Sequence, residues 1–185
     1  MVTNLDVQKV FKQIFGENDF DKFNSFLDIG CGRYNIDPSI NHEWWVFFNN
    51  IKEKTGIDFA IEELTSKKKN YPNANFIWGD ALDEIKKLDK NFDLVMCHQM
   101  IEHISKEKGI ELVKEIIRVS KKAIFITTPF EWNDNENAVR IHNNSLEKHQ
   151  CLWTVNDFEK LGLKTCLTRC EKVICAWILK EKQIK

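Results

Sequence analysis

The sequence predicts an α/β fold, a doubly wound and mostly parallel sheet with helices on both faces, and three observations support this. Short apolar runs recur along the chain and end in glycine, polar or acidic residues, as buried parallel strands often do. Stretches with the helical spacing of apolar residues separate most of these runs. The last two strand-like runs alternate instead, which is typical of antiparallel strands. The expected strands cover residues 26–29, 55–58, 75–78, 92–97, 122–129, 164–170 and 173–180.

The helices are expected from the same kind of pattern. Residues 4–15 form an amphipathic N-terminal helix, because their apolar side chains recur every three or four positions until Gly16 stops the helix. Thr154 is a suitable N-cap for the last helix. The lysines at the end of the second sheet-covering helix, in Ser66-Lys67-Lys68-Lys69, are expected to be solvated. Sheet-covering helices are expected over about 43–53, 60–69, 82–88, 105–118 and 157–161.

Composition limits the class of protein. The 185 residues fit a single domain, an N-terminal helix at about 4–15 followed by a core over about 20–185. A formal net charge of −1 gives no general attraction to nucleic acid or to an anionic membrane. There is no run of apolar residues long enough for a signal peptide or a membrane span, so we expect a soluble cytoplasmic protein. The sequence does not indicate an oligomeric state.

Six cysteines are present and none forms a Cys-x-x-Cys pair. Without a secretory signal this favours buried free thiols over a metal site. Cys166 and Cys170 lie an even number of positions apart and are expected on one face of a strand.

The turn after the first expected strand is the strongest chemical feature. Phe26-Leu27-Asp28-Ile29 runs directly into Gly30-Cys31-Gly32. Glycine allows unusual dihedral angles and has no Cβ, so the backbone of such a turn can approach a ligand closely. A second apolar run ends in Asp58, the placement at which doubly wound folds hold ribose hydroxyls.

In order and spacing, these strand ends resemble those of the class I S-adenosylmethionine (SAM)-dependent methyltransferases. The resemblance covers roughly residues 20–180 and implies a Rossmann-like, seven-stranded sheet with an antiparallel C-terminal strand. It also implies SAM as cofactor and S-adenosylhomocysteine (SAH) as product. Many members of this family have a third glycine, in the pattern Gly-x-Gly-x-Gly. In this chain Arg33-Tyr34-Asn35 follows Gly32 instead.

The resemblance implies a set of cofactor-binding residues. Asp28, Gly30 and Gly32 surround the methionine half and the ribose, and Asp58 accepts the ribose hydroxyls. Asp80, with the backbone of Ala81, faces the adenine; a plain turn-capping aspartate is the alternative for Asp80. Two buried thiols beside these strand ends complete the set, which is Asp28, Gly30, Cys31, Gly32, Asp58, Asp80, Ala81 and Cys97.

The residues after the fourth strand, Cys97 to His103, lie beside the transferred methyl in related enzymes. Ubiquinone-biosynthesis O-methyltransferases and small-RNA 2′-O-methyltransferases carry Glu-x-x-Glu-His here and bind a divalent metal. This chain has Gln99-Met100-Ile101-Glu102-His103 and a later His149 in the frame of the RNA enzymes. Loss of one carboxylate weakens a hard-cation site, so a metal is not favoured. A site for a softer divalent ion, with Gln99, Glu102, His103 and His149 as ligands, is the alternative.

Without a metal, the expected catalytic residues are Glu102 and three histidines, His98, His103 and His149, because imidazole has a suitable pKa for a general base. The leading hypothesis is methyl transfer to oxygen or nitrogen of a small molecule. A metal-assisted RNA 2′-O-methyltransferase and a non-catalytic SAM-binding partner subunit are the alternatives. The acceptor pocket is expected from residues 33–45 and 130–150, with 33–42 becoming ordered when SAM binds.

Overall fold

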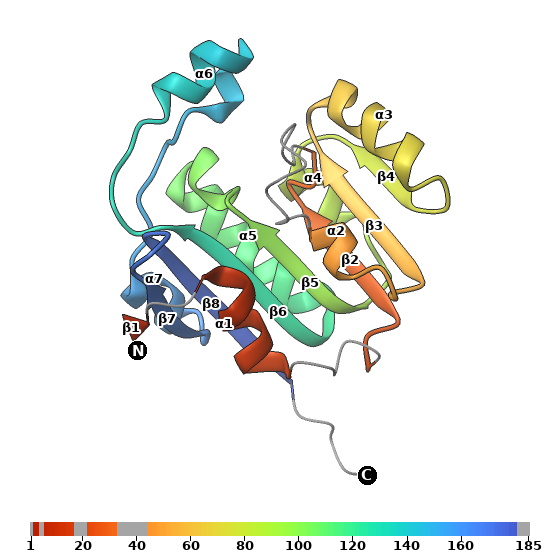
Figure 1. Cartoon of the computed structure of the whole chain (residues 1–185), viewed down its shortest axis with the longest axis horizontal. Helices are drawn as coiled ribbons and strands as arrows, with labels where there is room; N and C mark the ends of the chain where they lie inside the picture. The colour runs from red at the N-terminus through yellow and green to blue at the C-terminus, as the bar shows by residue number, and fades with distance from the viewer. Residues whose placement is uncertain (1, 4–5, 17–21, 33–43, 181–185) are drawn as a thin grey trace.

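A single eight-stranded sheet organises the chain in the computed structural model, which describes residues 2–3, 6–16, 22–32 and 44–180. The strand order is β1-β7-β8-β6-β5-β2-β3-β4, and β8 runs antiparallel to both of its neighbours (Figure 1). Seven of these strands form the predicted mostly parallel sheet. The eighth, β1, adds two residues at the edge beside β7. The strands are β1 Val2–Thr3, β2 Ser25–Ile29, β3 Glu53–Asp58, β4 Asn75–Trp78, β5 Phe92–His98, β6 Ser120–Pro129, β7 Lys164–Thr168 and β8 Val173–Leu179.

Helices cover both faces of the sheet, as a doubly wound fold requires (Figure 1). Side chains of α1, α2 and α3 pack on one face, and side chains of α4, α5 and α7 pack on the other. Successive β2 residues point to opposite faces, so Phe26 joins the first core and Leu27 the second. The helices are α1 Val7–Phe15, α2 Trp44–Phe47, α3 Ile61–Asn70, α4 Ala81–Lys86, α5 Lys106–Val119, α6 Glu136–His142 and α7 Val155–Lys160, with short 3-10 helices η2 Ile101–His103 and η3 Ser145–Glu147.

Capping residues explain where two of these helices begin. The Asp6 carboxylate accepts a hydrogen bond from the Lys9 amide at 2.8 Å, so α1 starts at Val7 and not at residue 4. Thr154 caps α7 as predicted, and Asp157 completes a reciprocal capping box with it. No helix in the described part of the chain is long and apolar enough to cross a membrane.

The structure corrects three further predictions. The helix expected over 43–53 is only Trp44–Phe47, because Glu53 pairs with Ser25 and starts β3. Cys170 does not share a strand face with Cys166, since β7 ends at Thr168 and Cys170 lies exposed in the following turn. Lys67 is not solvated, because only 6% of it is exposed.

The two segments expected to form the acceptor pocket, 33–45 and 130–150, differ in how much of them the structure describes. The segment 33–42, with its expected ordering by SAM, lies outside the described residues. Of the expected acceptor segment 33–45 only Trp44 and Trp45 are described, and both are buried in the core. The segment 130–150 contains α6 and η3 and extends beyond the carboxyl ends of β5 and β6 (Figure 1).

Candidate functional site

The glycine turn, residues 30–32, closes β2 against the end of β3. The amides of Gly30 and Cys31 both donate to the Ile57 carbonyl, at 2.9 and 3.2 Å. Gly30 has φ +73°, and a Cβ there would lie 2.5 Å from Cγ of Met100. Both the dihedral angle and the close approach therefore require glycine at this position.

Asp58 ends β3 and ties the turn to the next helix. Its Oδ2 accepts from the Gly32 amide at 2.7 Å and its Oδ1 accepts from the Ala60 amide at 2.8 Å. Each carboxylate oxygen can accept a second hydrogen bond. Asp58 can therefore hold a ligand hydroxyl while it keeps the turn in place.

Asp80 caps α4, as the alternative for it expected, and it also lines the cavity described below. Its Oδ1 accepts from the amides of Leu82 and Asp83, at 2.9 and 3.3 Å. The cap places Asp80 and Ala81 at the carboxyl end of β4 and beside the cavity described next.

A cavity of about 470 Å³ lies at the carboxyl ends of β2 to β5, where open α/β sheets bind ligands. Its volume is in the range of small-molecule sites. Residues from η3 line it opposite the strand ends, so the segment 130–150 contributes to the cavity as expected. The expected site residues that line it are Gly30, Asp58, Asp80, Ala81, His98, Gln99 and His103.

The remaining expected cofactor residues lie behind this lining. Asp28, Cys31 and Cys97 are fully buried, with exposed fractions of 0%. Asp28 accepts a hydrogen bond from the Trp45 indole at 2.6 Å, and Cys31 packs so closely on Gly56 that a Cβ there would meet its sulfur at 2.4 Å. Gly32 reaches the site through its amide bond to Asp58. These four residues support the lining from behind.

The chain turns sharply after β5, where Gln99 takes a positive φ of 50°. His98 Nδ1 lies 2.6 Å from the Thr127 hydroxyl oxygen, which also receives a bond from the Gln99 amide group at 3.4 Å. Thr127 of β6 therefore orients two of the candidate residues. The sequence reasoning missed it because β6 reads as a uniform buried strand.

Glu102 is almost completely buried at the start of η2, with 2% of it exposed. Its Oε2 accepts from the Thr128 hydroxyl at 3.0 Å, and its Oε1 has no hydrogen-bond partner among the described residues. Burial raises the pKa of Glu102 to about 8. The side chain therefore carries a proton at neutral pH. Thr128, which sequence reasoning also missed, fixes its orientation.

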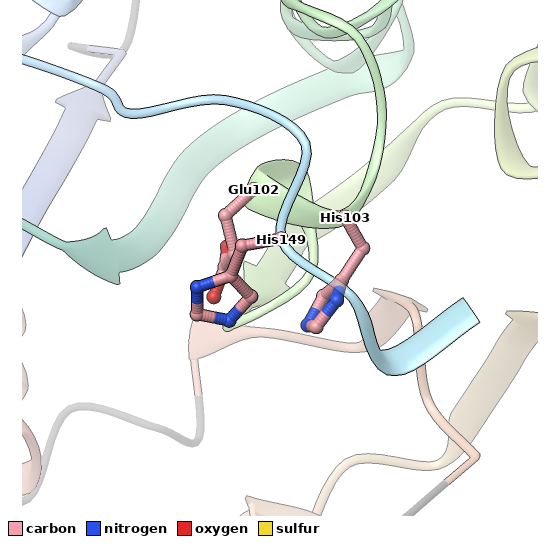
Figure 2. Close-up of side chains that lie close together, drawn as sticks. All are labelled: Glu102, His103 and His149. Carbon is pink, nitrogen blue, oxygen red and sulfur yellow. The ribbon is translucent and has the colours of Figure 1, made fainter. Parts of the chain in front are cut away.

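Glu102, His103 and His149 form one group, the acid–histidine cluster (Figure 2). Ligand atoms of the three side chains all lie within 4.8 Å of one another, and the two imidazole rings are 4.8 Å apart at an angle of 74°. Burial lowers the pKa of both histidines, so both are neutral at pH 7. His103 Nδ1 is buried with no hydrogen-bond partner in the described part of the chain. The predicted convergence of these residues is therefore present.

Backbone hydrogen bonds hold the His149 segment against η2. The amides of Gln150 and Cys151 both donate to the Glu102 carbonyl, at 2.8 and 3.3 Å, and the Gln150 side chain donates to the His103 carbonyl at 2.7 Å. On the other side the His149 amide donates to the Asp134 carbonyl at 3.2 Å. His149, 46 positions after His103 in the sequence, is thus fixed beside it by its own neighbours.

Comparisons with known proteins agree with this architecture. The family model described as "Methyltransferase domain" matches residues 26–123, more than half of the chain. Among curated proteins, none matches the chain in sequence. An O-methyltransferase family protein from Burkholderia thailandensis has a similar structure, with a TM-score of 0.63 and 11% identity over 95% of this chain and 56% of that chain.

Two further solved structures are similar. Magnesium protoporphyrin IX methyltransferase from Synechocystis PCC 6803 with bound SAH gives a TM-score of 0.61 and 12% identity over 95% of this chain and 82% of that chain. The plantazolicin methyltransferase BpumL in complex with SAH gives a TM-score of 0.60 and 18% identity over 93% of this chain and 80% of that chain. At these identities the likeness concerns the fold. This chain spans just over half the length of the Burkholderia protein and most of the other two.

Proposed function

Because this chain belongs to the methyltransferase-domain family, and is thus a SAM-dependent enzyme, we propose that it methylates a small molecule at an oxygen or nitrogen atom. The observation that carries the proposal is the acid–histidine cluster, whose His103 lines the same cavity as Gly30 and Asp58, although Glu102 and His149 do not line it. The cavity volume of about 470 Å³ suits a small-molecule ligand of the size of the cofactor. A further similar structure is the mitomycin 7-O-methyltransferase MmcR, with a TM-score of 0.58 and 14% identity over 91% of this chain and 52% of that chain. Its name agrees with transfer to an oxygen atom.

The residues at the strand ends fit the cofactor. The turn at Gly30 has no side chain to keep a ligand away, and Asp58 can accept the ribose hydroxyls with the lone pairs that its backbone partners leave. Asp80 and Ala81 line the same cavity, which supports their assignment to the adenine. SAM supplies a methyl group on a good leaving group, so alignment contributes most of the rate.

The cluster supplies the acid–base chemistry. A neutral imidazole of His103 or His149 accepts the acceptor's proton as the methyl group is transferred. Oε1 of protonated Glu102 has no partner among the described residues, so it is free to donate a hydrogen bond to the acceptor, while Oε2 stays bound to Thr128. His98, whose Nδ1 contacts the Thr127 hydroxyl, also lines the cavity and is a further candidate base.

Titration calorimetry with SAM and SAH, followed by transfer of labelled methyl from SAM to a panel of small alcohols, phenols and amines, tests the proposal. We expect both ligands to bind and at least one acceptor class to be labelled. Absence of SAH binding would contradict the cofactor assignment. Binding without transfer to any acceptor of this panel, or to RNA 3′ ends tested in the same assay, would instead favour a non-catalytic SAM-binding subunit.

The cluster also supports a second candidate, a metal-assisted methyltransferase. Two imidazole nitrogens and one carboxylate oxygen within 4.8 Å of one another suit a zinc-like ion better than Mg²⁺, which prefers several charged oxygens. In that case Glu102, His103 and His149 hold the ion. Methyl transfer that survives exhaustive chelation supports a histidine acting as general base. Loss of activity on chelation, with recovery when Zn²⁺ or Mn²⁺ is added, supports the metal-assisted mechanism. A net charge of −1 argues against RNA as the acceptor in either case.

A further inference from the structure

One lysine of α3 is buried beneath the glycine turn. Lys67 is 6% exposed, whereas its neighbours Lys68 and Lys69 are exposed. Burial of an ammonium group is costly unless its donors are used. Its Nζ donates to the Cys31 carbonyl at 2.6 Å and lies 4.9 Å from the centre of the Trp45 ring. A buried lysine therefore donates a hydrogen bond to a carbonyl of the cofactor turn.

The Cys31–Gly32 peptide is held from both of its ends. In a trans peptide the carbonyl and the following amide point in opposite directions. The Cys31 carbonyl accepts a hydrogen bond from Lys67 Nζ, and the Gly32 amide donates one to Asp58 Oδ2 at 2.7 Å. The two interactions therefore fix the same peptide plane, and rotation of the plane breaks both.

The surroundings leave this peptide little freedom elsewhere. The Cys31 amide donates to the Ile57 carbonyl at 3.2 Å, and the Cys31 sulfur packs on Gly56. The Trp45 ring faces Lys67 while its indole N–H donates to Asp28 at 2.6 Å, so one ring links a buried cation and a buried anion. Lys67 thus supplies the one side-chain donor that the structure gives to the Cys31 carbonyl among the described residues.

We propose that Lys67 is a positioning residue for the cofactor: it sets the Cys31–Gly32 peptide plane and thereby aims the Asp58 carboxylate into the cavity. Lys67 acts through Asp58 and does not line the cavity itself. The inference rests on the proposed use of SAM at this site.

The test measures SAH affinity by calorimetry for Lys67→Met, with Lys69→Met as the matched control on the exposed side of the same helix. Met keeps most of the packing on Trp45 and removes the charged donor. We expect Lys67→Met to weaken SAH binding about 10- to 100-fold, the range for a lost hydrogen bond to a charged group. Lys69→Met should bind as the parent does. A folded Lys67→Met protein with affinity within about twofold of the parent would overturn the inference.

A double-mutant cycle with Asp58→Asn separates positioning from a general structural effect. If Lys67 acts through Asp58, the double variant should bind SAH no more weakly than Asp58→Asn alone. Additive losses would show that Lys67 acts independently and overturn the inference. If Lys67→Met does not fold, Lys67→Arg replaces it in the cycle, where a smaller loss that is still non-additive is expected. Failure of the parent protein to bind SAH refutes the proposed cofactor use instead.

Discussion

Burial determines what each side chain of the acid–histidine cluster can do. Burial raises the pKa of Glu102 to about 8, whereas it lowers the pKa of His103 and of His149. All three groups are therefore uncharged at neutral pH. An uncharged cluster holds a proton donor beside two proton acceptors without strong mutual repulsion, which suits proton removal from a neutral acceptor.

Replacement of His149 by Ala tests its role as a base. The methyl-transfer rate should fall about 100- to 10,000-fold, the usual contribution of general-base catalysis. SAH affinity should change little, because His149 is not among the residues that line the cavity with Gly30, Asp58 and Asp80. Single-turnover rates and calorimetry on the same preparation measure both quantities. An unchanged rate would leave His103 or His98 as the base.

The pH dependence of the rate should follow the histidines. Burial lowers the pKa of His103 and His149 below the ordinary value of 6.5, although the nearby Glu147 charge opposes this shift in part. The basic imidazoles therefore persist until the pH falls below 6.5, and the acid limb of the rate profile should lie there. Loss of the Glu102 proton through its pKa of about 8 should give a basic limb. A rate profile at saturating SAM measures both limbs. An acid limb centred above 6.5 would contradict the role of these histidines.

Replacement of Asp58 by Ala tests the cofactor site at its most connected residue. The variant removes a possible ribose acceptor and the partner of the Gly32 amide together. SAM and SAH binding should weaken by about 1–3 kcal/mol, the scale for losing a buried polar partner. Calorimetry gives the value directly. Unchanged SAM affinity would remove Asp58 from the site.

At the scale of elements, the sequence predicts the helices and strands that bury a regular stripe of apolar side chains. The strands and α5 bury regular apolar stripes and are found nearly as expected. Helix α6 was missed because it buries no such stripe, with Ile141 73% exposed. The length of α2 was overestimated because pairing of β3 with β2 is not visible in the local pattern. Local periodicity therefore identifies packed elements and misses those that depend on distant partners.

The edge of the sheet opposite the cavity carries an ion pair that stabilises β5. Burial alone would raise the pKa of Asp93, but hydrogen bonds from Lys122 and the Asn24 amide outweigh it and hold that pKa below its ordinary 3.8. Because the folded pKa is lower than the unfolded one, the carboxylate stabilises the fold fully above the unfolded value. This stabilisation is lost as the pH falls through the folded value.

Asp93→Asn should accordingly lower the free energy of unfolding by about 1–3 kcal/mol at pH 7, because the substitution removes the buried negative charge that pairs with the partly exposed Lys122. The difference from the parent should shrink as the pH is lowered through the folded pKa. Urea unfolding at a series of pH values measures it. A difference that stays constant down to pH 3 would assign the loss to packing alone.

At the scale of the whole molecule, the site is assembled from parts far apart in sequence. Its strand-end residues were predictable because parallel strands deliver their carboxyl ends to one edge. His149 reaches the cluster through backbone bonds to η2, and its position was expected by resemblance and not from any local pattern. Thr127, Thr128 and the buried state of Lys67 depend on tertiary neighbours, so a single sequence carries no signal for them.

Ligand binding should stabilise the folded chain as a unit, because the cavity joins four strand ends to η3. SAH at 100 times its dissociation constant contributes about 2.7 kcal/mol, which corresponds to roughly 5–10 °C in Tm for a domain of this size. Differential scanning fluorimetry with and without SAH measures the shift.

Two glycine variants connect that shift to the glycine turn. Gly30 and Gly162 have similar positive φ values, +73° and +83°, so replacing either by Ala strains the backbone by about 1–2 kcal/mol and lowers the Tm of the free protein. A Cβ at Gly30 also meets Met100 at 2.5 Å beside the cavity, whereas one at Gly162 meets nothing within 4 Å. Gly30→Ala should therefore lose most of the SAH-induced shift, and Gly162→Ala should keep it. An equal shift in the two variants would place the cofactor away from the turn.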